Sequence, residues 1–299
     1  MEITFLGTSE AVPTAKKGQT AIILNYESEN ILVDCGEGTQ RQMKIANFNI
    51  CKTTRILITH WHADHILGIP GMLQTLATNN YVKTLHIYGP KGTKQHMDLM
   101  LKMFVFYGKI KVEVHEIMKD GIFFETDDFA LNAYEMDHPC PCLAYSFEEK
   151  EKRRIKMDYL KKAGLKPGPL YGELQKGKTI SFNGKKISPK NATTVQKGRK
   201  VSFVLDTAPN KNCILVAKGA DLLISEATFI ESEHSDKAEE RGHLTAKQAA
   251  TMAKQAKALR LLLTHISQRY ANDESGVLAE AKKVFKNSEL AKDFMKIKL

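Results

Sequence analysis

The spacing of apolar residues changes repeatedly along the chain, from short apolar runs to longer segments with apolar residues three or four positions apart. The short runs predict strands, and the longer segments predict amphipathic helices. In the first half, strands are expected at residues 3–6, 20–25, 31–33, 56–59, 84–88, 111–117 and 129–135. Helices are expected there at residues 39–46, 70–78 and 94–104.

The second half of the chain repeats this order of strands and helices. Strands are expected at residues 201–205, 221–225, 260–264 and 295–299. Helices are expected at residues 156–163, 245–256 and 275–285. Thr39 and Thr245 are predicted to cap the helices that begin near them. The repeated pattern predicts an α/β protein in which two β-sheets pack face to face with helices on the outside.

A histidine-rich segment follows the strand expected at residues 56–59. It places His60, His62, Asp64 and His65 within six residues. His60 and His62 share one face of an extended chain, whereas Asp64 and His65 lie past the turn and can face a second point nearby. Imidazole nitrogens and carboxylate oxygens are zinc ligands, and four in one short segment exceed what one tetrahedral ion easily takes. The spacing favours two adjacent metal ions over a set of surface histidines.

Further candidate ligands follow other predicted strands. His138, Asp206 and His265 each stand just past a strand end. Ligands in α/β proteins usually gather outside the carboxyl ends of strands, so these three side chains are expected to join the histidine-rich segment. Asp34 also follows a strand, and it is either a partner that orients a ligand histidine or a turn aspartate.

Composition describes an ordinary globular protein. Of 299 residues, 42% are hydrophobic and 26% are charged. The five cysteines form an odd, unpaired set that is typical of reduced thiols, which predicts a cytoplasmic location. No long apolar run and no basic leader are visible, so neither a membrane span nor a signal peptide is expected.

Positive charge is concentrated in one segment. Residues 148–200 contain 16 Lys or Arg and 5 Asp or Glu, a net charge of +11, whereas the whole chain carries +10. Such a segment predicts salt-dependent binding to a polyanion, and the alternative is a solvated lysine-rich loop. Glycines and prolines at residues 164–172 prevent the preceding helix from continuing.

Eight motifs, in order along the whole chain, resemble those of ribonuclease Z, the tRNA 3′-processing endoribonuclease of the metallo-β-lactamase superfamily. They lie at residues 5–14, 34–40, 60–65, 137–138, 205–207, 225–229, 242–245 and 264–270. The resemblance implies a four-layer αββα metallo-β-lactamase sandwich that forms a single domain over residues 1–299. It also implies that residues 148–190 are an inserted, flexible, basic arm that binds tRNA.

The resemblance assigns metal ligands to two zinc ions per chain, with manganese as a possible substitute. One ion is held by His60, His62 and His138, and Asp206 bridges both ions. The second ion is held by Asp64, His65 and His265.

The resemblance also assigns catalytic and substrate-binding roles. Asp64 also orients the nucleophile, His243 protonates the leaving oxygen, and Glu226 holds His243. Alternatively, His243 merely flanks the N-terminus of a helix. The alternative for Arg269 is a partner in a surface ion pair. Leu244 departs from the family, which often has serine there. The substrate-binding residues so implied are Thr245, Ser267, Arg269, Lys166, Gly168 and Pro169.

The implied reaction is zinc-dependent removal of the 3′ trailer from precursor tRNA by attack of a metal-bound hydroxide. It leaves a 3′-hydroxyl on the tRNA and a 5′-phosphate on the trailer. The family also implies a cytoplasmic homodimer without membrane association. Two alternatives stay open: another dizinc hydrolase of this fold, such as a phosphodiesterase, thioesterase or lactonase, and an RNA-binding protein with an inactive site. The sequence leaves open which precursors are cut and how the CCA end is treated.

Overall fold

The computed structural model describes residues 1–106, 108 and 110–299. The chain divides into two compact units. Unit 1 consists of Met1–Phe123, Leu131–Phe147 and Lys200–Leu299. Unit 2 consists of Phe124–Ala130 and Glu148–Arg199.

The first sheet has seven strands in the order β18-β1-β2-β3-β4-β5-β6. Its strands are β1 (Glu2–Gly7), β2 (Ala21–Tyr26), β3 (Glu29–Val33), β4 (Arg55–Leu57), β5 (Thr84–Gly89), β6 (Lys111–Glu116) and β18 (Lys296–Lys298). The pairs from β18 to β3 are antiparallel, and those from β3 to β6 are parallel. The parallel part carries β3 and β4, whose carboxyl ends lead into the motifs at residues 34–40 and 60–65.

The second sheet also has seven strands, in the order β17-β16-β15-β14-β9-β8-β7. Its strands are β7 (Gly121–Glu125), β8 (Phe129–Met136), β9 (Cys142–Glu149), β14 (Lys200–Val204), β15 (Leu222–Glu226), β16 (Leu261–Thr264) and β17 (Ser288–Leu290). Strands β14 to β17 are parallel, so their carboxyl ends meet at one edge.

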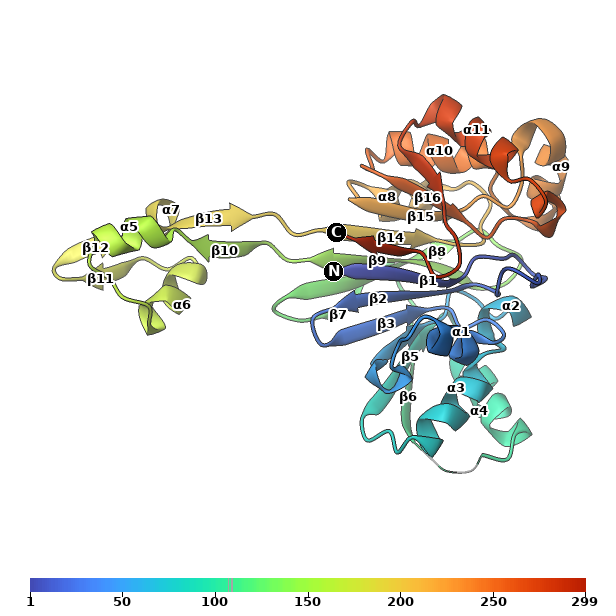
Figure 1. The fold of residues 1–299 in the computed structure, drawn as a ribbon, viewed down its shortest axis with the longest axis horizontal. Helices are drawn as coiled ribbons and strands as arrows, with labels where there is room; N and C mark the ends of the chain where they lie inside the picture. Colours follow the sequence, from blue (N-terminus) through green and yellow to red (C-terminus); the bar gives the residue numbers. More distant parts are fainter. Residues whose placement is uncertain (107, 109) are drawn as a thin grey trace. The chain divides into compact units, whose positions relative to one another are not determined.

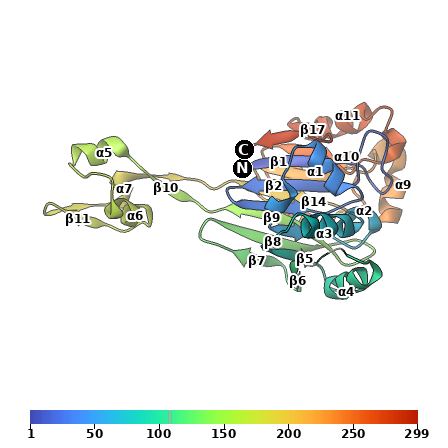
Figure 2. The ribbon, with the colours of Figure 1, turned by 60° about the horizontal axis from the view of Figure 1, so that its bottom comes forward.

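Helices cover the outer face of each sheet (Figures 1 and 2). The helices on the first sheet are α1 (Thr39–Ile45), α3 (Ile69–Thr78) and α4 (Thr93–Met103), which share a core with Leu32, Ile56 and Ile87. Those on the second are α8 (Lys211–Ala217), α10 (Ala246–Gln255) and α11 (Ser275–Val284), which share a core with Val204, Leu223 and Leu263. The remaining helices of unit 1 are the short η1 (Ile50–Lys52), α2 (Ala63–Ile66) and η2 (Gln268–Tyr270), and α9 (Glu231–Arg241).

The inner faces of the two sheets meet through aromatic side chains. The ring centroids of Tyr26 on β2 and Phe147 on β9 are 5.0 Å apart. Tyr145 on β9 donates a hydrogen bond to the carbonyl oxygen of Ile58, at 2.7 Å. Because both faces of the central strands are covered, their side chains are almost all buried. The predicted αββα sandwich is confirmed.

Unit 2 has a small core of its own. It contains β10 (Lys152–Ile155), α5 (Met157–Lys162), α6 (Pro169–Gln175), β11 (Ile180–Phe182), β12 (Lys185–Ile187), α7 (Pro189–Ala192) and β13 (Thr193–Gln196). Strand β10 pairs with β13, and β11 pairs with β12. The buried residues are Leu160, Leu165, Leu174, Ile180, Ile187 and Ala192. The basic segment is therefore folded around apolar side chains rather than extended as a loop.

Two local predictions can be compared with the structure directly. Thr245 does cap α10, because its hydroxyl accepts a hydrogen bond from the Gln248 backbone N–H. The Thr245 backbone N–H in turn donates to the Gln248 side-chain oxygen. The prediction for Thr39 is wrong: Gly38 is the cap residue, with φ 75°, and the Thr39 hydroxyl donates to the Gly36 carbonyl at 2.7 Å. Glycine takes this position because a left-handed backbone costs it nothing. No helix within the described part of the chain is long and apolar enough to cross a bilayer.

Candidate active site

Three candidate residues lie just past strand ends, in a backbone conformation that residues with a side chain rarely adopt. Asp34 follows β3 with φ 55°, Asp206 follows β14 with φ 38°, and His265 follows β16 with φ 55°. Such conformations cost free energy, on the order of 1–3 kcal/mol each, and persist where the surrounding structure enforces them. The strand ends therefore turn sharply, and the site is built at these turns.

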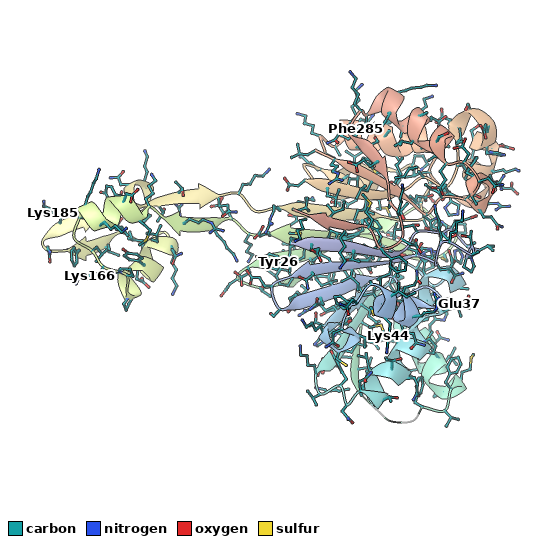
Figure 3. All side chains as sticks on the ribbon, viewed as in Figure 1. Tyr26, Glu37, Lys44, Lys166, Lys185 and Phe285 are labelled. Carbon is teal, nitrogen blue, oxygen red and sulfur yellow. The ribbon has the colours of Figure 1, made fainter. Side chains whose placement is uncertain are left out.

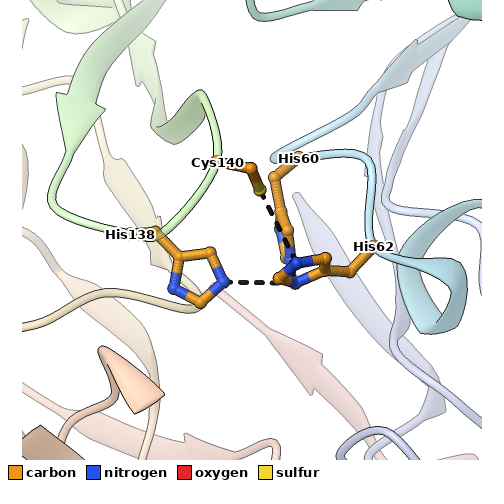
Figure 4. Close-up of side chains that lie close together, drawn as sticks. All are labelled: His60, His62, His138 and Cys140. Carbon is orange, nitrogen blue, oxygen red and sulfur yellow. Dashed lines mark hydrogen bonds between the residues drawn. The ribbon is translucent and has the colours of Figure 1, made fainter. Parts of the chain in front are cut away.

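The first cluster contains three imidazoles (Figure 4). The Nε2 atom of His60 lies 2.9 Å from Nδ1 of His62, which lies 3.2 Å from Nε2 of His138. The other ring nitrogen of His62 lies 3.8 Å from the Cys140 thiol. The three nitrogens thus face a common point.

The second cluster joins two imidazoles and a carboxylate. Oδ2 of Asp64 lies 3.2 Å from Nε2 of His65 and 3.4 Å from Nε2 of His265. His65 and His265 are fully buried, and Asp64 is nearly so. This cluster is therefore shielded from solvent.

The Asp206 carboxylate lies between the two clusters. Its Oδ2 is 3.6 Å from Nε2 of His60 and 3.4 Å from Nε2 of His65. Its Oδ1 is 3.3 Å from Nε2 of His265. All seven side chains predicted as metal ligands are thus brought together, with Asp206 in contact with both groups.

These donor atoms fit divalent cations. Two atoms bound at about 2.0–2.1 Å to one tetrahedral ion lie about 3.3–3.4 Å apart, which is close to the spacings in both clusters. His65 Nε2 and Asp206 Oδ1 are buried and lack a hydrogen-bond partner among the described residues. Buried polar atoms in native proteins are nearly always satisfied, so these two require a ligand. The clusters are therefore compatible with metal binding.

Charge at the site also favours a cation. Burial lowers the pKa of His65, but the carboxylates of Asp206 and Asp34 outweigh it and raise that pKa well above its ordinary value. Burial raises the pKa of Asp206, but His265 and His65 outweigh it and hold that pKa well below its ordinary value. Asp206 therefore remains ionised and attracts positive charge to the centre.

Hydrogen bonds hold three of the rings with Nε2 toward the centre. His65 Nδ1 lies 2.7 Å from Asp34 Oδ2, and His138 Nδ1 lies 3.1 Å from the Gly242 carbonyl oxygen. His265 Nδ1 lies 3.1 Å from the Thr228 hydroxyl. In the neutral ring with Nδ1 donating its proton outward, Nε2 has its lone pair available for a ligand. The structure gives Asp34 the geometry of a supporting residue.

The imidazole of His243 lies beside both clusters. Its ring centroid is 5.5 Å from that of His138 and 5.6 Å from that of His265. Its Nδ1 lies 3.2 and 3.1 Å from the two carboxylate oxygens of Glu226. Burial lowers the pKa of His243, but the Glu226 carboxylate outweighs it and raises the pKa to about 9. His243 is thus placed to be an imidazolium next to the candidate metal centre.

Glu226 is held by two further donors that the sequence did not single out. The Thr207 backbone N–H donates to Oε1 at 2.7 Å, and the Thr228 hydroxyl donates to Oε2 at 2.6 Å. Thr228 follows β15, directly beyond Glu226 and Ala227, so its position past a strand end was the available signal. Thr228 therefore links the Glu226–His243 pair to His265.

A pocket of about 1030 Å³ opens onto His138 and His243. Five carboxylates also line it: Asp137, Glu231, Glu239, Glu240 and Glu280. This acidic wall was not predicted from the sequence, because four of the five residues come from α9 and α11, whose charges are typical of solvated helix faces. The pocket gives His243 access to solvent and to a substrate.

The residues predicted to bind substrate do not form one cluster, unlike the candidate metal ligands. The Thr245 hydroxyl is buried and lies 3.1 Å from Glu231 Oε2, besides capping α10. Arg269 donates from Nε to the buried Ser267 hydroxyl at 3.1 Å and lies over the Phe229 ring. Leu244 is buried in the core with α10. Lys166, labelled in Figure 3, belongs to unit 2 together with Gly168 and Pro169. Pro169 begins α6.

Comparisons with known proteins agree with this geometry. A family model described as Anti-Pycsar protein Apyc1 matches residues 1–139. The Ribonuclease Z of Methanothermobacter thermautotrophicus is 42% identical, over 100% of this chain and 97% of that protein. The Ribonuclease BN of Cronobacter sakazakii is 38% identical over 99% of both chains. The crystal structure of the short form of human tRNase Z matches with a TM-score of 0.73 and 28% identity, over 100% of this chain and 99% of that one. The chain therefore belongs to the ribonuclease Z family of endoribonucleases.

Proposed function

We propose that the protein removes the 3′ trailer from precursor tRNA in a reaction that requires two zinc ions. The observation that carries the proposal is the pair of His/Asp clusters joined by Asp206, with His243 and Glu226 beside them. Full-length similarity to proteins named Ribonuclease Z supplies the substrate class.

The residues that would hold the ions are those of the two clusters. His60, His62 and His138 would bind one zinc, and Asp206 would bind both. Asp64, His65 and His265 would bind the other. Bound divalent ions would neutralise charge on the phosphodiester and make water a stronger nucleophile near neutral pH. Manganese is the alternative metal, because carboxylate oxygens suit it as well as zinc.

His243 would protonate the 3′ oxygen of the tRNA as the phosphodiester bond breaks. Its Nδ1 is directed at Glu226, which leaves Nε2 for the leaving oxygen. The Glu226 carboxylate stabilises the imidazolium from which this proton comes. Asp64 would also orient the attacking water. The products would be a 3′-hydroxyl on the tRNA and a 5′-phosphate on the trailer.

Further contacts to the RNA would come from two places. In unit 1, Arg269 has a guanidinium suited to a phosphate, and Thr245 and Ser267 would be the other substrate-binding residues. In unit 2, the candidates are Lys166 and the Gly168–Pro169 pair at the start of α6. Unit 2 would bind the tRNA backbone through its positive charge, so affinity would fall as salt increases.

The homodimer and the cytoplasmic location are also parts of this proposal. The homodimer rests on the resemblance to the family, and the cytoplasmic location also rests on the five unpaired cysteines. The oligomeric state can be measured by light scattering on the purified chain.

The test is cleavage of a 3′-extended precursor tRNA, with both product ends mapped and zinc counted on the same sample. A single cut at the trailer junction, with the expected ends and two metal ions per chain, would support the proposal. His62→Ala should lose metal and cleavage together, whereas a zinc-replete, fully active His62→Ala protein would refute the ligand assignment. Turnover of small diesters or esters without cleavage of tRNA would instead favour another dizinc hydrolase. Tight tRNA binding without any hydrolysis would favour an RNA-binding protein with an inactive site.

A further inference from the structure

A second group of potential metal ligands lies at the far edge of the first sheet. His86 is on β5, and Glu113 and His115 are on β6, the edge strand (Figure 1). In the parallel register His86 is opposite Glu113, and Tyr88 is opposite His115. Because side chains alternate along a strand, all of these residues lie on the same face of the sheet.

The three side chains present one donor atom each to a common point. Nδ1 of His86 lies 3.3 Å from Nε2 of His115 and 3.5 Å from Oε2 of Glu113. The three donor atoms lie within 4.8 Å of one another. Two of these separations match the spacing of about 3.3–3.4 Å expected for ligands on one tetrahedral ion.

The surroundings orient the donors. The Tyr88 ring stacks on His115, with centroids 4.6 Å apart and planes at 17°. The Lys111 ammonium lies 2.9 Å from Oε1 of Glu113 and therefore competes with a cation for that carboxylate, whereas Oε2 lies 3.5 Å from His86. His86 and Glu113 are partly exposed, so a cation from solvent can reach them.

We propose that His86, Glu113 and His115 form a third metal site, which binds a divalent cation of the zinc class. Two imidazoles and one carboxylate are typical ligands of such ions, and water would supply the fourth position. None of the three residues belongs to the two clusters described above. A cation bound here would cross-link β6 to β5 and hold the edge strand of the sheet in place.

The test is a zinc titration of the wild-type protein whose other sites are already filled. Wild-type protein with two zinc ions is mixed with a chromophoric chelator and titrated with zinc, and bound metal is counted after removal of free zinc. One additional ion per chain is expected. The double variant His86→Ala/His115→Ala should lose it, because removing even a supporting partner of a ligand typically costs about 10–100-fold in affinity. Asp98→Asn, which removes an exposed carboxylate on α4, is the matched control and should retain the third ion.

A variant that is expected to bind the third ion more tightly separates loss of the site from loss of the fold, because a misfolded protein would not gain affinity. Lys111→Gln removes the ammonium that competes for Glu113, so it should bind the third ion several-fold more tightly than wild type. Two ions in wild type under these conditions would overturn the proposal, and so would a third ion that persists in the double variant. Unchanged affinity in Lys111→Gln would remove Glu113 from the site and overturn the three-ligand assignment. These outcomes are independent of tRNA cleavage, because the readout is bound zinc.

Discussion

The buried carboxylate of Asp34 gives the sharpest test of how the candidate metal centre is built. Asp34 Oδ1 accepts from the Thr59 backbone N–H at 2.7 Å. Its Oδ2 accepts from the Thr59 hydroxyl at 2.8 Å and lies 2.7 Å from His65 Nδ1. Oδ2 therefore takes part in two hydrogen bonds, one with the Thr59 hydroxyl and one with His65. The bond with His65 also fixes the tautomer of that ring.

Asp34→Asn replaces one carboxylate oxygen by an amide NH₂ group, with almost no change in the shape of the side chain. If the amide oxygen keeps the bond from the Thr59 backbone, the amide N–H₂ faces His65 Nδ1. Two donors cannot share a hydrogen bond, so His65 must move its proton to Nε2, the atom that faces Asp64 and Asp206. Loss of a supporting partner of this kind typically costs about 10–100-fold in metal affinity, which is about 1.4–2.8 kcal/mol.

The assay is zinc affinity measured by competition with a chromophoric chelator, together with cleavage at saturating zinc. We expect weaker binding of one ion and partial recovery of activity when zinc is added in excess. Thr59→Val removes the hydroxyl that donates to Asp34 and lies 3.0 Å from His60 Nδ1, so it should also weaken zinc binding but leave the bond between Asp34 and His65 in place. Asp127→Asn, at an exposed turn, is the control. Wild-type zinc affinity in a folded Asp34→Asn protein would show that Asp34 does not orient a ligand.

Three further predictions concern catalysis, substrate binding and stability. His243→Ala should retain both zinc ions and lose about 10²–10⁴-fold in kcat on precursor tRNA; a change in KM alone would contradict its role as the acid, and both quantities come from steady-state kinetics. Deleting residues 150–190 should weaken binding of precursor tRNA, reduce the salt dependence of that binding and spare a small phosphodiester; equal losses on both substrates would show that unit 2 is needed for the fold of unit 1. Removing metal with a chelator should lower the Tm by several degrees, because a ligand present at 100 times its Kd stabilises the folded state by about 2.7 kcal/mol. An unchanged Tm in calorimetry, with metal loss verified, would mean that the clusters do not bind metal in the folded state.

The sequence predicted the sandwich well because each central strand is short, apolar and followed by a polar turn. The runs at residues 201–205 and 260–264 correspond closely to β14 and β16. Strands buried on both faces are nearly continuous in apolar residues, so they stand out without a partner. The αββα arrangement follows from these strands and from the amphipathic helices between them.

Other elements escaped prediction for physical reasons. The helix α9 has a strongly polar sequence and a kink at His234, with φ −144°, so it lacks an apolar face of regular period. The helix α6 begins at Pro169, within the stretch interpreted only as a place where the preceding helix ends. Proline is well suited to the first turn of a new helix, because its missing N–H has no partner there. Breaker residues therefore mark the boundary of a helix without telling which side of it is helical.

At the candidate site, the candidate metal ligands could be predicted from the sequence, but the hydrogen bonds made by Thr207 and Thr228 could not. The ligand types at strand ends could be recognised along the chain, but Thr228 and Thr207 act through hydrogen bonds to residues that fold near them. A threonine after a strand is common, and nothing in its neighbours shows which buried acceptor it will meet. Asp34 could be proposed as a partner from its place after a strand, whereas the contacts of Thr207 and Thr228 required the structure.

The backbone at the site explains how these candidate ligands are brought together. Asp34, Asp206 and His265 adopt left-handed conformations just past the ends of buried strands. The parallel ladders of β3–β4 and β14–β16 fix those strand ends, and the cores behind them bury the strands on both faces. The strain of the turns and the unsatisfied atoms of His65 and Asp206 both oppose folding, and both are confined to the point where a cation would bind. Burial in the sandwich thus offsets the free energy of holding the donor atoms in place.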